Sequence, residues 1–100
     1  MAGKAISVEE FVEKQAKLRV IDVRDPGAFA SDGPQLPNSE NIPMHQLEHR
    51  TKNWNQFESL MVVCADGSDS AEAQDILLKA GFISVVRLEG GVGAWKESGI

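Results

Sequence analysis

The feature that most constrains this fold is a run of four apolar residues that ends at the only cysteine of the chain. The run is Leu60–Val63, and Cys64 follows it directly. Two of the four residues are β-branched, which favours a strand buried on both faces, as in a parallel sheet. Because helices must cover both faces of such a sheet, the sequence predicts an α/β fold.

A predicted helix follows this strand after a short polar loop with Gly67 in its middle. Asp69 and Glu72, three residues apart, are typical of a helix start with a capping box. Apolar residues then recur at helical spacing as far as Gly81, at Ala73, Ile76, Leu77 and Ala80. Cys64 is therefore expected between the carboxyl end of a strand and the amino end of a helix, where open α/β sheets bind ligands.

The loop favours a reactive thiol. Backbone N–H groups of such a turn, together with the helix terminus, stabilise an anion, and the thiolate is the reactive form of cysteine. Asp66 and Asp69 oppose this, since a like charge at ~6 Å costs about 1 to 3 kcal/mol. Each hydrogen bond to the charged sulfur returns about 1.5 to 3 kcal/mol, so we expect the backbone to prevail. An inert cysteine that ends a core strand is the alternative, and this stretch alone leaves both open.

Length and composition narrow the class of protein. One hundred residues, 42% of them hydrophobic, fit one compact domain over 1–100. No apolar run approaches the roughly 20 residues that span a bilayer, and the amino end has no signal-peptide core. A single cysteine fits a reducing compartment, and a net charge of −5 without a basic run argues against nucleic acid. We expect a cytoplasmic monomer with no membrane or nucleic-acid partner.

Strand and helix patterns alternate along the rest of the chain. Strands are expected at 5–6, 18–23 and 83–88, and helices at 8–16, from 26, at 44–49 and at 92–98. Residues 41–43 are expected to be extended, because the residue before a proline is restricted. The first helix has a capping box, Ser7 with Glu10, and Val8, Phe11, Val12 and Ala16 on one face. Residues 31–39 read as a loop, and Trp54 and Phe57 are expected to pin the polar stretch 52–58 to the core. This alternation predicts a right-handed parallel sheet of four or five strands between two helical layers.

Several short motifs occur in an informative order. They are Val-Ile-Asp-Val-Arg-Asp-Pro at 20–26, Phe29, Asn-Ile-Pro at 41–43, the Cys64 loop, Gly-Phe at 81–82, Leu-Glu-Gly-Gly-Val-Gly-Ala-Trp at 88–95, and Gly99. Together they resemble a single-domain rhodanese over nearly the whole chain. The resemblance implies the rhodanese-like three-layer fold, a small parallel sheet of four to five strands with helices on both faces.

The resemblance also implies an activity. It is that of a sulfurtransferase, which moves a sulfane sulfur from a donor such as thiosulfate, through a cysteine persulfide, to an acceptor such as cyanide or a thiol. Cys64 would be the catalytic residue, without cofactor or metal. Donor and acceptor would be small sulfur compounds or protein persulfides. The substrate-binding residues would be those of the loop: Ala65, Asp66, Gly67, Ser68, Asp69 and Ser70.

The sequence departs from the family pattern in ways that concern the donor. The family often has a cationic residue late in the active loop, where this chain has Asp69. The usual Gly-His-Ile-Pro-Gly-Ala is replaced by residues 33–40, with one residue inserted and no histidine. With two acids and no base in the loop, the natural donor stays open, because thiosulfate is a dianion.

Other polar residues have simpler interpretations. Asp22 and Arg24 are expected to form a structural ion pair that supports the loop. For Asp69 we favour a helix cap over a catalytic acid, and Asp66 is a candidate for tuning donor choice. His45 and His49 could form a metal pair, but with no further ligand nearby we expect exposed histidines.

Two other functions compete with sulfur transfer. A cysteine phosphatase needs an arginine six residues after the cysteine to clamp phosphate, and Ser70 stands there in a loop one residue too short. A non-catalytic rhodanese-like binding or regulatory module is the stronger alternative, and the acidic loop is its best argument. The retained cysteine argues for the enzyme.

Overall fold

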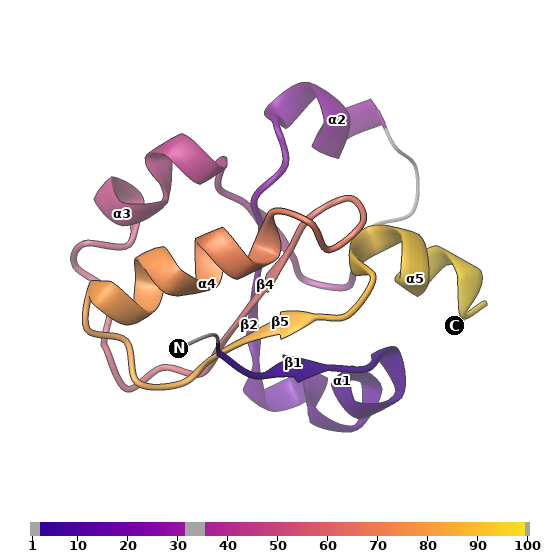
Figure 1. The fold of residues 1–100 in the computed structure, drawn as a ribbon, viewed down its shortest axis with the longest axis horizontal. Coiled ribbons are helices and arrows are strands. Elements are labelled where there is room, and N and C mark those ends of the chain that lie inside the picture. Colours follow the sequence, from indigo (N-terminus) through magenta and orange to yellow (C-terminus); the bar gives the residue numbers. More distant parts are fainter. Residues whose placement is uncertain (1–2, 32–35, 100) are drawn as a thin grey trace.

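The computed structural model describes residues 3–31 and 36–99, and at its centre lies a five-stranded sheet (Figure 1). Its strands are β1 (Ala5–Ile6), β2 (Arg19–Asp22), β3 (Glu40–Asn41), β4 (Leu60–Val63) and β5 (Val85–Leu88). They lie in the order β1-β5-β4-β2-β3, and every neighbouring pair is parallel. The helices are α1 (Val8–Lys14), α2 (Pro26–Ser31), α3 (Leu47–Arg50), α4 (Ser70–Lys79) and α5 (Gly91–Glu97), with short 3₁₀ turns η1 (Gln15–Lys17) and η2 (Met44–Gln46).

β4 is the central strand, and all four of its residues are buried. Leu60 and Val62 belong to the core beneath α3 and α4, while Met61 and Val63 belong to the core beneath α1 and α5. Successive side chains point to opposite faces of a strand, so an uninterrupted apolar run supplies both cores. Figure 1 shows α3 and α4 on one side of the sheet and α1 and α5 on the other. The predicted three-layer α/β fold is confirmed.

Local signals explain how the covering helices begin and end. Ser7 caps α1 by accepting a hydrogen bond from the Glu10 N–H at 3.1 Å. After α4, Gly81 adopts φ 106°, and the N–H groups of Gly81 and Phe82 return to the carbonyls of Leu78 and Leu77. That pair of bonds is a Schellman motif, which ends the helix and turns the chain toward β5.

Four expectations about individual residues are wrong. Asp69 precedes α4 without making a side-chain cap hydrogen bond, and the Glu10 carboxylate binds Lys14 instead of closing the capping box of α1. Ala16 lies exposed in η1, because α1 has already ended. Phe57 is 76% exposed, so Trp54 alone of the two packs against the core.

Of the predicted loop at 31–39, the structure describes Ser31 and residues 36–39. Ser31 still belongs to α2, and Leu36 is buried in the core beneath α1 and α5, which the polar composition did not suggest. Residues 32–35, part of the 33–40 departure from the family motif, lie outside the described residues. Among the described helices, none is long and apolar enough to cross a membrane.

Candidate active site

Cys64 lies immediately beyond the carboxyl end of β4, at the base of the loop that leads to α4. It is 3% exposed. Its Sγ accepts hydrogen bonds from the backbone N–H groups of Gly67, at 3.0 Å, and Asp69, at 3.4 Å. Two backbone N–H groups therefore converge on this sulfur, an arrangement that suits the binding of negatively charged groups.

Side chains of the loop hold its shape. Asp66 accepts a hydrogen bond from the Ser68 N–H at 2.9 Å. Hydrogen bonding to Ser68 lowers the pKa of the Asp66 carboxyl, with the Ser68 side chain contributing most and the Ser68 backbone N–H next. Ser70 is fully buried and donates to the Gly67 carbonyl at 3.1 Å. The hydroxyl of Ser70 is thus engaged within the loop rather than directed at a substrate. Gly67 adopts φ 92°, a conformation that glycine allows without strain.

The amino end of α5 fixes the loop from below, a role the sequence analysis missed. The N–H groups of Val92 and Gly93 donate to the carbonyls of Cys64 and Ala65, each at 2.9 Å. Gly91 adopts φ 61°, and a Cβ there would collide with the Cys64 carbonyl oxygen and lie 2.9 Å from the Gly67 nitrogen. The glycine pair at 90–91 signalled only a turn in the sequence, because a close approach to a distant loop leaves no local pattern.

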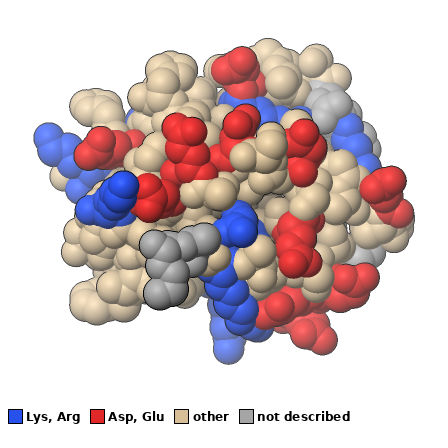
Figure 2. Space-filling view, in the orientation of Figure 1, with Lys and Arg blue, Asp and Glu red and all other residues tan. Residues whose placement is uncertain are grey.

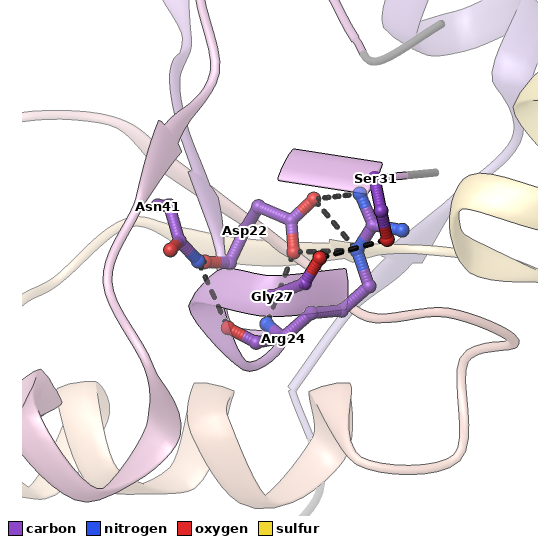
Figure 3. Close-up of polar contacts among 5 residues, drawn as sticks. All are labelled: Asp22, Arg24, Gly27, Ser31 and Asn41. Carbon is purple, nitrogen blue, oxygen red and sulfur yellow. Dashed lines mark hydrogen bonds and ion pairs between the residues drawn. The ribbon is translucent and has the colours of Figure 1, made fainter. Parts of the chain in front are cut away.

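Asp22 and Arg24 form the expected ion pair beside this loop (Figure 3). The Arg24 guanidinium binds the Asp22 carboxylate through Nε, at 3.0 Å to Oδ1, and Nη2, at 2.9 Å to Oδ2. The side chains are 5% and 1% exposed. Asn41 on β3 donates to the carbonyls of both residues, so the Asn41 side chain ties the end of β2 and the following turn to the neighbouring strand.

A cleft of about 630 Å³ opens above Cys64. Apart from Cys64 and Ala65, its walls are formed by Val23, Arg24, Asp25, Ala28, Met44, His45, Glu48, Asp69, Glu72 and Ile76. Figure 2 shows acidic side chains gathered over α4 and the loop before it. Among the residues the structure describes, no group of three or more histidine, cysteine or acidic side chains could hold a metal ion. His45 and His49 are both exposed.

Not all predicted loop residues face this cleft in the same way. Cys64, Ala65 and Asp69 line it, Asp66 and Ser68 are exposed and bonded to each other, and Gly67 contributes its N–H to the sulfur. The arrangement presents one recessed sulfur, two backbone donors and an acidic entrance. Such a site suits nucleophilic attack by the cysteine on a small compound.

The sequence of the chain matches a known protein family. A sequence model described as the Rhodanese-like domain matches residues 7–98. The chain belongs to the rhodanese-like domain family. The chain is 34% identical over 97 residues to the thiosulfate sulfurtransferase GlpE of Shewanella oneidensis, covering 95% of this chain and 94% of the relative.

A solved structure agrees. The rhodanese-related protein of Thermoplasma volcanium superposes with a TM-score of 0.85 at 32% identity, covering 97% of this chain and 94% of the other.

A second solved structure bears on the phosphatase alternative. A protein of Rhodopseudomonas palustris, described as a possible tyrosine phosphatase, is 25% identical, with a TM-score of 0.83 and coverage of 96% of this chain and 81% of the other. In this chain, however, position 70 is a buried serine bonded to the Gly67 carbonyl. A serine there cannot supply the guanidinium that clamps a phosphate, so this position does not favour phosphate chemistry.

Proposed function

We propose that this rhodanese is a sulfurtransferase that carries a sulfane sulfur on Cys64 as a persulfide. One observation carries the proposal: the N–H groups of Gly67 and Asp69 both point at the Cys64 Sγ. The family assignment adds support, since relatives at 30–34% identity are named thiosulfate sulfurtransferases.

The reaction needs only the cysteine and its surroundings. The Cys64 thiolate attacks the outer sulfur of a donor such as thiosulfate, a sulfur–sulfur bond forms, and sulfite leaves with the electron pair of the broken bond. An acceptor such as cyanide or a thiol then attacks the outer sulfur of the persulfide, and the Cys64 thiolate returns. The starting thiolate and the persulfide anion both carry negative charge on sulfur, which the backbone donors stabilise.

The acidic cleft bears on which donor is used. Asp69 lines the cleft and Asp66 lies in the same loop, so a dianionic donor meets like charge on its approach. The natural donor, the monomeric state and a cytoplasmic location remain predictions. A non-catalytic binding module is the second candidate, favoured by this acidic lining.

The decisive variant is Cys64→Ser. We expect the parent protein to release thiocyanate from thiosulfate and cyanide, and the variant to show no release above background while unfolding at an unchanged denaturant midpoint. Serine is nearly isosteric but cannot form a persulfide. Residual activity in the folded variant would refute the role of Cys64, and an inactive parent with every donor would favour the binding module.

A further inference from the structure

The cleft above Cys64 collects carboxylates from separate parts of the fold. Asp25 precedes α2, Glu48 lies on α3, Asp69 precedes α4, and Glu72 lies in the first turn of α4. Within residues 3–31 and 36–99, none of the four forms an ion pair. Arg24 also lies on the wall, and its guanidinium is bound to Asp22.

We propose that these carboxylates make the site selective for a cationic sulfur acceptor, a small thiol that carries a protonated amine close to its sulfur. The inference rests on the proposed function, because it concerns the second half of that reaction. The site itself is the cleft with the Cys64 sulfur at its base, and the carboxylates decide which charge may enter it.

The charge of the reacting groups gives the reason. In the transfer step the thiolate of the acceptor attacks the outer sulfur of an anionic persulfide, a new sulfur–sulfur bond forms, and the old bond leaves its electron pair on the Cys64 Sγ. Two anions must therefore meet. A neighbouring ammonium group makes the attacking molecule neutral overall and is attracted by Glu48, Asp69 and Glu72, whereas a carboxylate on the acceptor is repelled by them.

The shape of the site favours a small molecule. Cys64 is 3% exposed and lies at the base of a cleft of about 630 Å³, so an acceptor must reach into it. Ala28, Met44 and Ile76 on the walls offer apolar contact to a short hydrocarbon spacer. A thiol with two carbons between its sulfur and its charged group is of a suitable size.

The test uses three thiols with the same two-carbon spacer: 2-mercaptoethylamine, which is cationic, 2-mercaptoethanol, which is neutral, and 3-mercaptopropionate, which is anionic. The protein is first loaded with sulfur by thiosulfate in high salt or by inorganic polysulfide, and loading is verified by intact mass. Excess donor is removed, and the rate at which each thiol unloads Cys64 is measured at low salt and pH 8, above the usual titration range of histidine. Rates are expressed per thiolate.

The readout is the ratio of the cationic to the anionic rate, compared between variants so that intrinsic thiol reactivity cancels. Glu48→Gln with Glu72→Gln should lower this ratio about tenfold, and Glu48→Gln alone about threefold, with 2-mercaptoethanol little changed. The fall should shrink at high salt. Glu13→Gln, on the exposed side of α1, removes an equal charge away from the cleft and should leave the ratio unchanged.

The outcomes separate the two proposals. If neither donor adds sulfur to Cys64, the proposed function fails. If sulfur is added and removed but the ratio is the same in the parent protein, the double variant and the Glu13 control, the acceptor inference is overturned while the sulfurtransferase proposal stands.

Discussion

The two ends of β2 use an arginine in opposite ways. At the amino end, Arg19 binds Glu40 at 2.5 Å and Glu58 at 3.2 Å, and its guanidinium carbon lies 3.4 Å from the centre of the Trp54 ring. The Arg19 side chain remains 35% exposed. Just beyond the carboxyl end, the Arg24 side chain is 5% exposed and binds Asp22 within the same turn.

The two edges of the sheet differ in how their charged side chains are paired. At the amino edge, acids and bases bind each other across segments that are distant in sequence, which joins the start of β2 to β3 and to the stretch before β4. At the carboxyl edge, one buried pair shapes the turn after β2, and the carboxylates around the Cys64 cleft form no ion pair among the described residues. Charge at the amino edge therefore serves stability, whereas the charge around the cleft is the charge that we propose acts on an entering acceptor.

The largest expected effect comes from the backbone support of the site. In Gly91→Ala, the new Cβ collides with the Cys64 carbonyl at a residue with φ 61°. Overpacking and left-handed strain together should cost about 3 to 5 kcal/mol of unfolding free energy, measured by denaturant titration. Any folded fraction should lose sulfurtransferase activity, because the loop must shift.

Gly99→Ala is the matched control for this change. Gly99 has φ 72°, and among the described residues, its chain neighbours aside, no atom lies within 4 Å of a Cβ added there, so it isolates the conformational strain, about 1 kcal/mol. Equal losses in the two variants would show that the contact between α5 and the Cys64 loop does not matter.

The two arginines give the next effect. Arg24→Ala leaves the Asp22 carboxylate buried without its partner and should cost about 3 kcal/mol, a fall in Tm of about 12 to 24 °C. Arg19→Ala, its matched counterpart, breaks partly exposed ion pairs and a stacking contact and should cost about 1 kcal/mol. An Arg24→Ala protein as stable as the parent but inactive would instead make Arg24 a catalytic residue.

Features of the fold that depend on residues close together in the sequence could be predicted from the sequence. The strand, loop and helix around Cys64 were predictable because a doubly buried strand needs an unbroken apolar run, as in Leu60–Val63. The Asp22–Arg24 ion pair could be predicted because both partners lie in one turn. These features depend on near neighbours.

Two of the errors, at Asp69 and Phe57, concern residues whose surroundings are set by distant segments, whereas those at Glu10 and Ala16 have local causes within and just after α1. Asp69 has the residue type and position of a cap, but its N–H is turned toward the Cys64 Sγ and its side chain lies on the cleft. The Trp54 ring is stacked against the guanidinium of Arg19, which lies 35 residues earlier in the sequence. Phe57, by contrast, is 76% exposed. The role of Gly91 depends on a loop that no local pattern connects to it.

The last prediction concerns the donor, and its effect is on the reaction rate rather than on stability. At separations of ~6 Å and an effective dielectric of 40 to 80, each like-charge pair costs about 0.7 to 1.4 kcal/mol. Asp66→Asn combined with Asp69→Arg should therefore raise kcat/KM for thiosulfate several-fold, up to one or two orders of magnitude, and less at high salt. Asp69 makes no side-chain cap, so its replacement should cost little stability.

A control variant tests whether the effect comes from charge in the loop or from the net charge of the protein. Glu13→Arg changes the net charge on α1, away from the cleft, and should leave kcat/KM for thiosulfate unchanged at the same ionic strength. If the loop variant folds and gains nothing at low salt, the charges of Asp66 and Asp69 do not set donor choice.

The most direct test of the account is the intact mass of the protein after incubation with thiosulfate and, separately, with a protein persulfide donor. We predict a gain of one sulfur atom on the parent protein, lost on addition of cyanide or a thiol, and no gain on Cys64→Ser. An unchanged mass with both donors, or an equal gain on Cys64→Ser, would contradict the claim that Cys64 carries the sulfur.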